Sequence, residues 1–120
     1  MTLSDVVLEK NTRAHDSNHR HITNNISDFH ALIDFGTFIL SIVQNDRSYG
    51  NESGLFEIGA FGQDPETGYA TVMLEIPGVT DDDDTVKGWL TFNDVDKILR
   101  QLTFEALSIH KFEPIQRFIK

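Results

Sequence analysis

The chain has 120 residues, 39% of them hydrophobic, and its 19 acidic and 10 basic side chains give a formal net charge of −9. This length suits one domain, and the acidic balance argues against a nucleic-acid groove, because such grooves need clustered Lys and Arg. The absence of cysteine excludes disulfides, thiolate nucleophiles and cysteine-based zinc sites, and no apolar run reaches the roughly 20 residues of a membrane span.

Residues 1–27 are polar and rich in Asn, His and Ser, with one short apolar patch that begins at Leu3. Because such a segment has little to bury, we expect a polar, mobile arm followed by a single domain over residues 28–120. The beginning of the chain also lacks the basic and apolar regions of a secretory signal. We therefore expect a soluble protein of the cytoplasm.

Three histidines in this arm, His15, His19 and His21, form the first potential metal site. Two imidazoles four residues apart on a helix could bind one metal ion. However, no neighbouring acid or further histidine completes a familiar ligand spacing, and no apolar stripe would hold the segment rigid. We favour a solvated arm over adventitious zinc or nickel binding.

The first dense apolar run, Phe35–Val43, is rich in aromatic and β-branched residues and is followed by polar residues typical of a turn. We predict one strand here. A helix over Ser27–Gln44 is the competing interpretation, because several apolar residues could share one helical face. Gly36 and the β-branched run favour the strand.

Two further runs, Leu55–Phe61 and Tyr69–Ile76, flank a loop that contains Asp64-Pro65 and Gly68. The second run alternates apolar residues with Thr71, Met73 and Glu75, which is the period of a strand with two different faces. Asp-Pro and Gly are turn formers. The pattern predicts an antiparallel hairpin.

After a short extended piece over Val86–Leu90, Thr91 is placed as a helix N-cap, and Asp94 can complete a capping box. The helix runs on through Leu107, and four apolar residues at i, i+3, i+4 and i+7 predict the stripe that it packs against the sheet: Val95, Ile98, Leu99 and Leu102. We therefore predict an α+β fold, a small antiparallel sheet of three to four strands packed by a C-terminal helix.

Four consecutive aspartates, Asp81–Asp84, precede the extended piece. Carboxylate oxygens bind hard cations, but a calcium loop of the EF-hand type needs Gly at its sixth position and Glu at its twelfth. Counted from Asp81, these positions hold Val86 and Phe92. We expect a charged, solvated loop and no metal site.

No catalytic signature is recognisable. The sequence has neither a G-x-S-x-G turn nor a phosphate loop ending in G-K-S/T. Glu57 and Glu75 could face each other across the predicted hairpin as an acid–base pair, although glutamates on the wet face of a sheet are commoner. We predict that the protein is not an enzyme, with no catalytic residues and no cofactor.

Several aromatic residues cannot all fit a core of this size, and aromatic side chains left at a surface are favoured anchors for protein partners. The alternative, that each ring caps an edge of the core, stays open. An acidic body is steered toward a basic surface on its partner. The candidate partner-binding residues are Tyr49, Trp89, Asp81, Asp82, Asp83 and Asp84.

Between Phe35 and Leu102, short motifs follow one another in a characteristic order. This order resembles that of small, uncharacterised accessory proteins of tailed bacteriophages, whose best motif is G-W/Y-L-T-x-x-D/E-V after a G-L-F/W/Y-E-I/V strand. The chain departs from the family at Pro77-Gly78, and two extra aspartates lengthen the following loop. The matching residues are Ser41–Val43, Ser48–Gly50, Gly54–Ile58, Val79–Asp82, Gly88–Thr91 and Asp94-Val95.

The resemblance implies a phage origin, hence the cytoplasm of a bacterial host, and a non-enzymatic accessory role. We expect the protein to bind and inhibit a host or phage protein with a basic surface, such as a defence or nucleic-acid enzyme, without binding nucleic acid directly. Two alternatives remain: a module that sequesters a small ligand or nucleotide, and a homo-oligomeric virion component.

Overall fold

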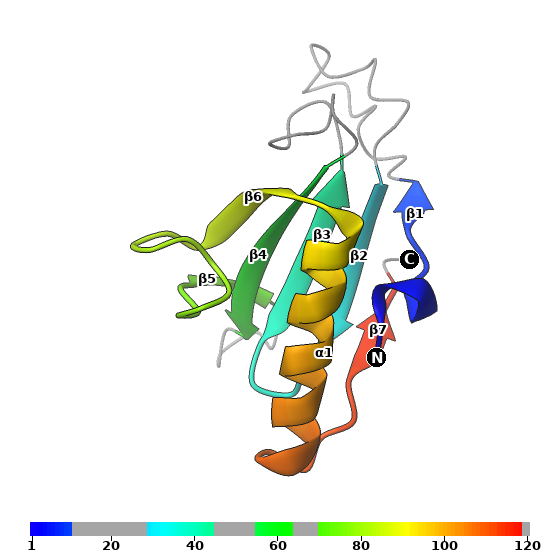
Figure 1. Cartoon of the computed structure of the whole chain (residues 1–120). Helices are drawn as coiled ribbons and strands as arrows, with labels where there is room; N and C mark the ends of the chain where they lie inside the picture. Colours follow the sequence, from blue (N-terminus) through cyan, green and yellow to red (C-terminus); the bar gives the residue numbers. More distant parts are fainter. Residues whose placement is uncertain (11–28, 45–54, 64–69, 119–120) are drawn as a thin grey trace.

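The computed structural model describes residues 1–10, 29–44, 55–63 and 70–118. Over these ranges the chain forms a seven-stranded sheet, with every paired strand antiparallel, and one α-helix. Figure 1 shows the helix lying along one face of the sheet. The predicted α+β class is therefore confirmed, but the sheet has more strands than the expected three to four.

The sheet is built around three central strands, and each outer edge is shared by two short strands. Along one edge of β2, β1 pairs with its beginning and β7 with its end. Along the far edge of β4, β6 pairs with its first half and β5 with its second half. The strands are β1 (Glu9–Lys10), β2 (Phe29–Asp34), β3 (Ile39–Gln44), β4 (Phe56–Gln63), β5 (Ala70–Leu74), β6 (Val86–Leu90) and β7 (Ile115–Arg117).

The predicted strand over Phe35–Val43 is confirmed for Ile39–Val43, which belong to β3, but is wrong for Phe35–Phe38, and the alternative helix over Ser27–Gln44 is wrong. The segment is a hairpin turn followed by β3. Gly36 adopts a φ of +90°, which glycine tolerates without strain, and its N–H donates to Asp34 Oδ1 at 2.8 Å. The rings of Phe35 and Phe38 stack across the turn with centroids 5.3 Å apart, so two aromatic side chains stand where polar turn residues are usual.

The predicted hairpin of β4 and β5 is confirmed, with Ala60 opposite Leu74 and Phe61 opposite Met73. Its connecting loop lies outside the described residues. The suggested acid–base pair is not formed, because Glu57 lies opposite Val43 on β3, whereas β5 ends at Leu74, opposite Ala60.

The helix α1 (Phe92–Ser108) begins where the sequence predicts. The Asp94 N–H donates to Thr91 Oγ1 at 3.1 Å, and the Thr91 N–H donates to Asp94 Oδ2 at 2.9 Å, which completes the capping box. Val95, Leu99 and Leu102 are buried, and Ile98 packs against the core from a half-buried position. The predicted helical stripe is confirmed.

Strand alternation supplies the other side of the core. Alternate residues of the three central strands point to the face covered by α1, and burial of each large aliphatic side chain stabilises the fold by about 1.5–3 kcal/mol. The buried residues that the three central strands contribute to this core are Ala31, Ile33, Leu40, Ile42, Phe56 and Ile58. The helix is therefore fixed against the middle of the sheet, and its N-terminus is held beside β6.

The beginning of the chain is docked onto this core. Leu3, in the 3-10 turn η1 (Leu3–Asp5), is 2% exposed, and its N–H donates to Asp96 Oδ1 on α1 at 2.7 Å. Of the predicted arm, residues 1–10 thus lie against the domain, while residues 11–27, including the three histidines, lie outside the described part of the chain. Within that part, no helix is both long and apolar enough to cross a membrane.

Candidate functional site

The candidate residues that the structure describes lie on β6 and on the loop before it. Trp89 belongs to β6, and Asp81–Asp84 form the preceding loop. Tyr49, the remaining candidate, lies outside the described residues.

Trp89 occupies a β-bulge at the sheet edge. Phe56 on β4 lies opposite Leu90, and Ile58 lies opposite Lys87, so that Gly88 and Trp89 together face one residue of β4. Such bulges re-aim side chains and interrupt strand pairing. The backbone of Trp89 has a φ of +61°, and its side chain is 61% exposed.

This conformation is unfavourable for tryptophan. The left-handed region costs an L-residue other than glycine roughly 1–2 kcal/mol, and residues held there cluster at functional sites. Phe92, at the first turn of α1, is 47% exposed. The corner between β6 and α1, defined by Trp89 and Phe92, therefore presents two aromatic side chains to solvent.

The acidic loop is a turn that two backbone hydrogen bonds close. The Asp84 N–H donates to the Asp81 carbonyl at 3.0 Å, and the Asp81 N–H donates to the Val86 carbonyl at 3.0 Å. All four aspartates are exposed. Among the described residues, no group of three or more His, Asp or Glu side chains is arranged to hold a metal ion.

The structure does not bring the two predicted patches together. Asp84 precedes β6 and Trp89 lies near the far end of this strand, so most of the length of β6 separates them. The acidic loop and the aromatic corner are thus two separate patches along one edge strand.

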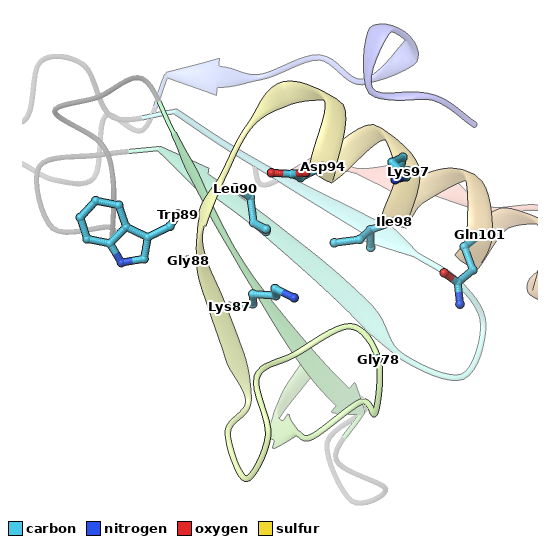
Figure 2. Close-up of a pocket in the computed structure, with 9 residues that line it drawn as sticks. All are labelled: Gly78, Lys87, Gly88, Trp89, Leu90, Asp94, Lys97, Ile98 and Gln101. Carbon is cyan, nitrogen blue, oxygen red and sulfur yellow. The ribbon is translucent and has the colours of Figure 1, made fainter.

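Sequence reasoning missed a hollow of about 440 Å³ beside this corner. It lies between β6, the turn at Gly78 and the first turns of α1 (Figure 2). Its position depends on the bulge and on the tertiary contact between β6 and α1, and neither has a signal in the local sequence. The residues that line it are Gly78, Lys87, Gly88, Trp89, Leu90, Asp94, Lys97, Ile98 and Gln101.

The charged groups of the hollow act on one another. The pKa of Asp94 is lowered mainly by the hydrogen bond from the Thr91 backbone N–H, and next by the hydrogen bond with the Thr91 side chain. The positive charges of Lys97 and Lys87 lower it further. Asp94 is therefore ionised at neutral pH, and its oxygen is already engaged by the helix cap. The lining of the hollow therefore combines two lysines and one carboxylate with the apolar residues Leu90 and Ile98.

Comparison of the chain with protein-family models, curated proteins and solved structures finds no match in any of the three.

Proposed function

We propose that this chain is a non-enzymatic, acidic accessory protein that binds another protein through the aromatic corner and the acidic loop, and thereby inhibits it. The observation that carries this proposal is Trp89, a large side chain that is 61% exposed and held in a left-handed backbone conformation. The phage origin, the bacterial host as the site of action and the host or phage identity of the partner rest on the resemblance of the sequence alone.

Trp89 contributes little to the core from this position. Tryptophan is among the residues most enriched at the energetic centres of protein interfaces, because its ring combines a large apolar area with an N–H donor. Phe92 extends the apolar area by one more exposed ring. A partner that covers this corner removes both rings from water.

The acidic loop indicates the charge of the partner surface. No basic residue occurs between Glu75 and Asp84, and each aspartate of the loop is exposed. Exposed charges of one sign raise the rate of association with an opposite surface more than they raise affinity. The partner surface that fits both patches has a basic region and, apart from it, an apolar recess.

The test is quantitative capture from a bacterial lysate with the tagged full chain and two single variants. Trp89→Ala should reduce the recovered partner at least about tenfold, as expected for the central residue of an interface. Phe104→Ala is the matched control, because Phe104 is 70% exposed on α1 but lies outside the aromatic corner. Equal loss with both variants, or no stoichiometric partner at any salt concentration, would contradict the proposal.

The acidic loop is tested on the partner so identified. Asp82→Asn combined with Asp83→Asn should slow association and weaken its dependence on salt, with a smaller change in the dissociation rate. Duplex DNA should not compete for the partner if the loop serves only to steer docking. An unchanged association rate would remove the acidic loop from the interface.

A further inference from the structure

The hollow beside the aromatic corner contains two lysines whose hydrogen-bonding capacity is unused. Among the described residues, no side-chain hydrogen bond or salt bridge involves the ammonium group of Lys87 or Lys97. Each ammonium carries three donors. Both residues line the hollow, and the positive charge of each contributes to lowering the pKa of Asp94 in the same hollow.

The bulge in β6 places Lys87 beside the hollow. Phe56 and Ile58 belong to the buried side of β4, and they lie opposite Leu90 and Lys87, respectively. In a regular strand, positions 87 and 90 would point to opposite faces. Figure 2 shows Lys87 and Leu90 both pointing toward α1, with the Trp89 ring on the other side of the strand.

The remaining walls suit a molecule with an apolar part. Leu90 is buried and Ile98 is half-buried at the junction of β6 and α1, and Gln101 adds an amide that can donate and accept. A volume of about 440 Å³ falls within the range of small-molecule sites, which combine apolar walls with a few convergent polar groups.

We propose that this hollow binds a small molecule carrying a phosphate or carboxylate group, which the ammonium groups of Lys87 and Lys97 hold while its apolar part lies against Leu90 and Ile98. The site adjoins the aromatic corner, since Trp89 also lines the hollow, but the Trp89 ring points to the other side of β6 from Lys87 and Leu90 (Figure 2). It also gives the ligand-binding alternative from the sequence a defined location and a defined ligand charge.

A different explanation for Lys87 is that an inward-pointing charge on an edge strand discourages pairing with another chain. That role requires the charge on Lys87 but no ligand, and it assigns nothing to Lys97. The two explanations therefore differ in whether anions perturb the hollow and in whether both lysines matter.

The experiment is an NMR titration of the full chain with AMP, benzoate, inorganic phosphate and adenosine, each to about 10 mM, where millimolar affinity is detected. We expect AMP or benzoate to shift the backbone amides of Gly78, Gly88 and Gln101. Adenosine, which lacks the charge, should shift them less. Inorganic phosphate carries the charge but no apolar part, so its shifts, compared with those of AMP, show how much of the binding depends on the anion alone.

Three variants test the assignment. Lys87→Gln and Lys97→Gln should each weaken binding about fivefold, the effect of one partly exposed charge pair. Lys111→Gln, which removes the same charge outside the hollow, should leave affinity unchanged. Asp94→Asn should strengthen binding, because it removes the negative charge from the hollow and keeps an oxygen for the Thr91 N–H.

The proposal is overturned if none of the anions shifts these amides, or if adenosine binds as tightly as AMP. It is also overturned if Lys111→Gln weakens binding as much as the two hollow variants do, since net charge alone would then explain the effect. Loss of the protein partner in Trp89→Ala with intact anion binding separates this site from the interface.

Discussion

At the scale of single residues, Trp89 combines exposure with an unfavourable backbone conformation. Its φ of +61° comes from the bulge opposite β4, and the adjacent Gly88, which would tolerate a positive φ without strain, is not the residue that adopts it. The chain therefore keeps the indole at this position at the expense of stability. The interface that we propose gives a reason for this.

The strain at Trp89 can be measured by comparing two substitutions. Trp89→Gly should be more stable than Trp89→Ala by about 1 kcal/mol, because only glycine relieves the left-handed conformation. Both variants lose the same side-chain contacts, so the difference isolates the backbone. Urea unfolding followed by circular dichroism measures it. An alanine variant as stable as the glycine variant would show that the backbone at this position is unstrained.

The sequence identified Trp89 as a surface candidate by a count of aromatic residues, but it could not identify the hollow. Alternation along Val86–Leu90 predicts that Lys87 and Leu90 point to opposite faces, and only the pairing of β6 with β4 shows the bulge that places them together. Lys97 is recognisable from sequence as an exposed helical residue. Only the tertiary structure shows that Lys97 lines the hollow.

At the scale of elements, patterns that local physics determines were predictable and the first hairpin was not. The capping box at Thr91 and the stripe of α1 follow from spacing alone. The turn between β2 and β3 is stabilised by stacked phenylalanines and by Asp34, so its composition is typical of a strand. Gly36 was the one local signal of this turn.

Gly36 provides a matched test of the hairpin. Its φ is +90°, and an added Cβ would lie 2.8 Å from Phe112 Cγ, whereas Gly78 has a φ of +82° with open space around it. Gly36→Ala should therefore destabilise the fold by about 2–3 kcal/mol, and Gly78→Ala by about 1 kcal/mol. Denaturant midpoints measure both. Equal effects would mean that the contact with Phe112 relaxes without cost.

Ionised aspartates stabilise both the helix α1 and the N-terminal turn η1. A backbone hydrogen bond from Thr2 is the main cause that lowers the pKa of Asp5, and one from Thr91 does the same for Asp94. For Asp96 the main cause is the hydrogen bond from Arg100, followed by that from the Leu3 N–H. Each carboxylate thus favours the folded state only while it is ionised.

This dependence predicts the direction of acid denaturation. Because the folded-state pKa values lie below the ordinary 3.8, the stabilisation is complete above about pH 5 and is lost as the pH falls through the folded values. Asp94→Asn should be less stable than the wild type at pH 7, and the two should converge toward pH 2.5. Urea midpoints across this range test it, and a constant gap would exclude Asp94 as a source of the acid sensitivity.

At the scale of the whole molecule, the two edges of the sheet differ. One edge is closed by both ends of the chain, since β1 and β7 pair with β2 and the Gln116 side chain makes two hydrogen bonds with the Val7 backbone. The opposite edge is formed by β5 and β6 (Figure 1). The acidic loop, the aromatic corner and the hollow lie on or beside β6.

Asp34 connects the closed edge to the first hairpin. Its Oδ1 accepts from the Gly36 N–H, and its Oδ2 accepts from Arg117 Nε and Nη2 at 3.2 and 3.0 Å. The Asp34 side chain is 12% exposed and that of Arg117 is 57% exposed. Removal of the guanidinium would leave a mostly buried carboxylate without its cationic partner. Because the Arg117 side chain is largely exposed, water also screens the ion pair.

Arg117→Gln should therefore destabilise the fold by about 1–2 kcal/mol, between the values for exposed and buried pairs. Asp34→Asn keeps the oxygen that caps the turn but turns an amide toward Arg117. Because each single change leaves one partner unmatched, the double variant should be more stable than the sum of the single effects predicts, by about 1 kcal/mol. Denaturant unfolding of the four proteins measures this coupling. Strict additivity would mean that β7 is held by its strand pairing alone, and that the closed edge does not depend on the ion pair.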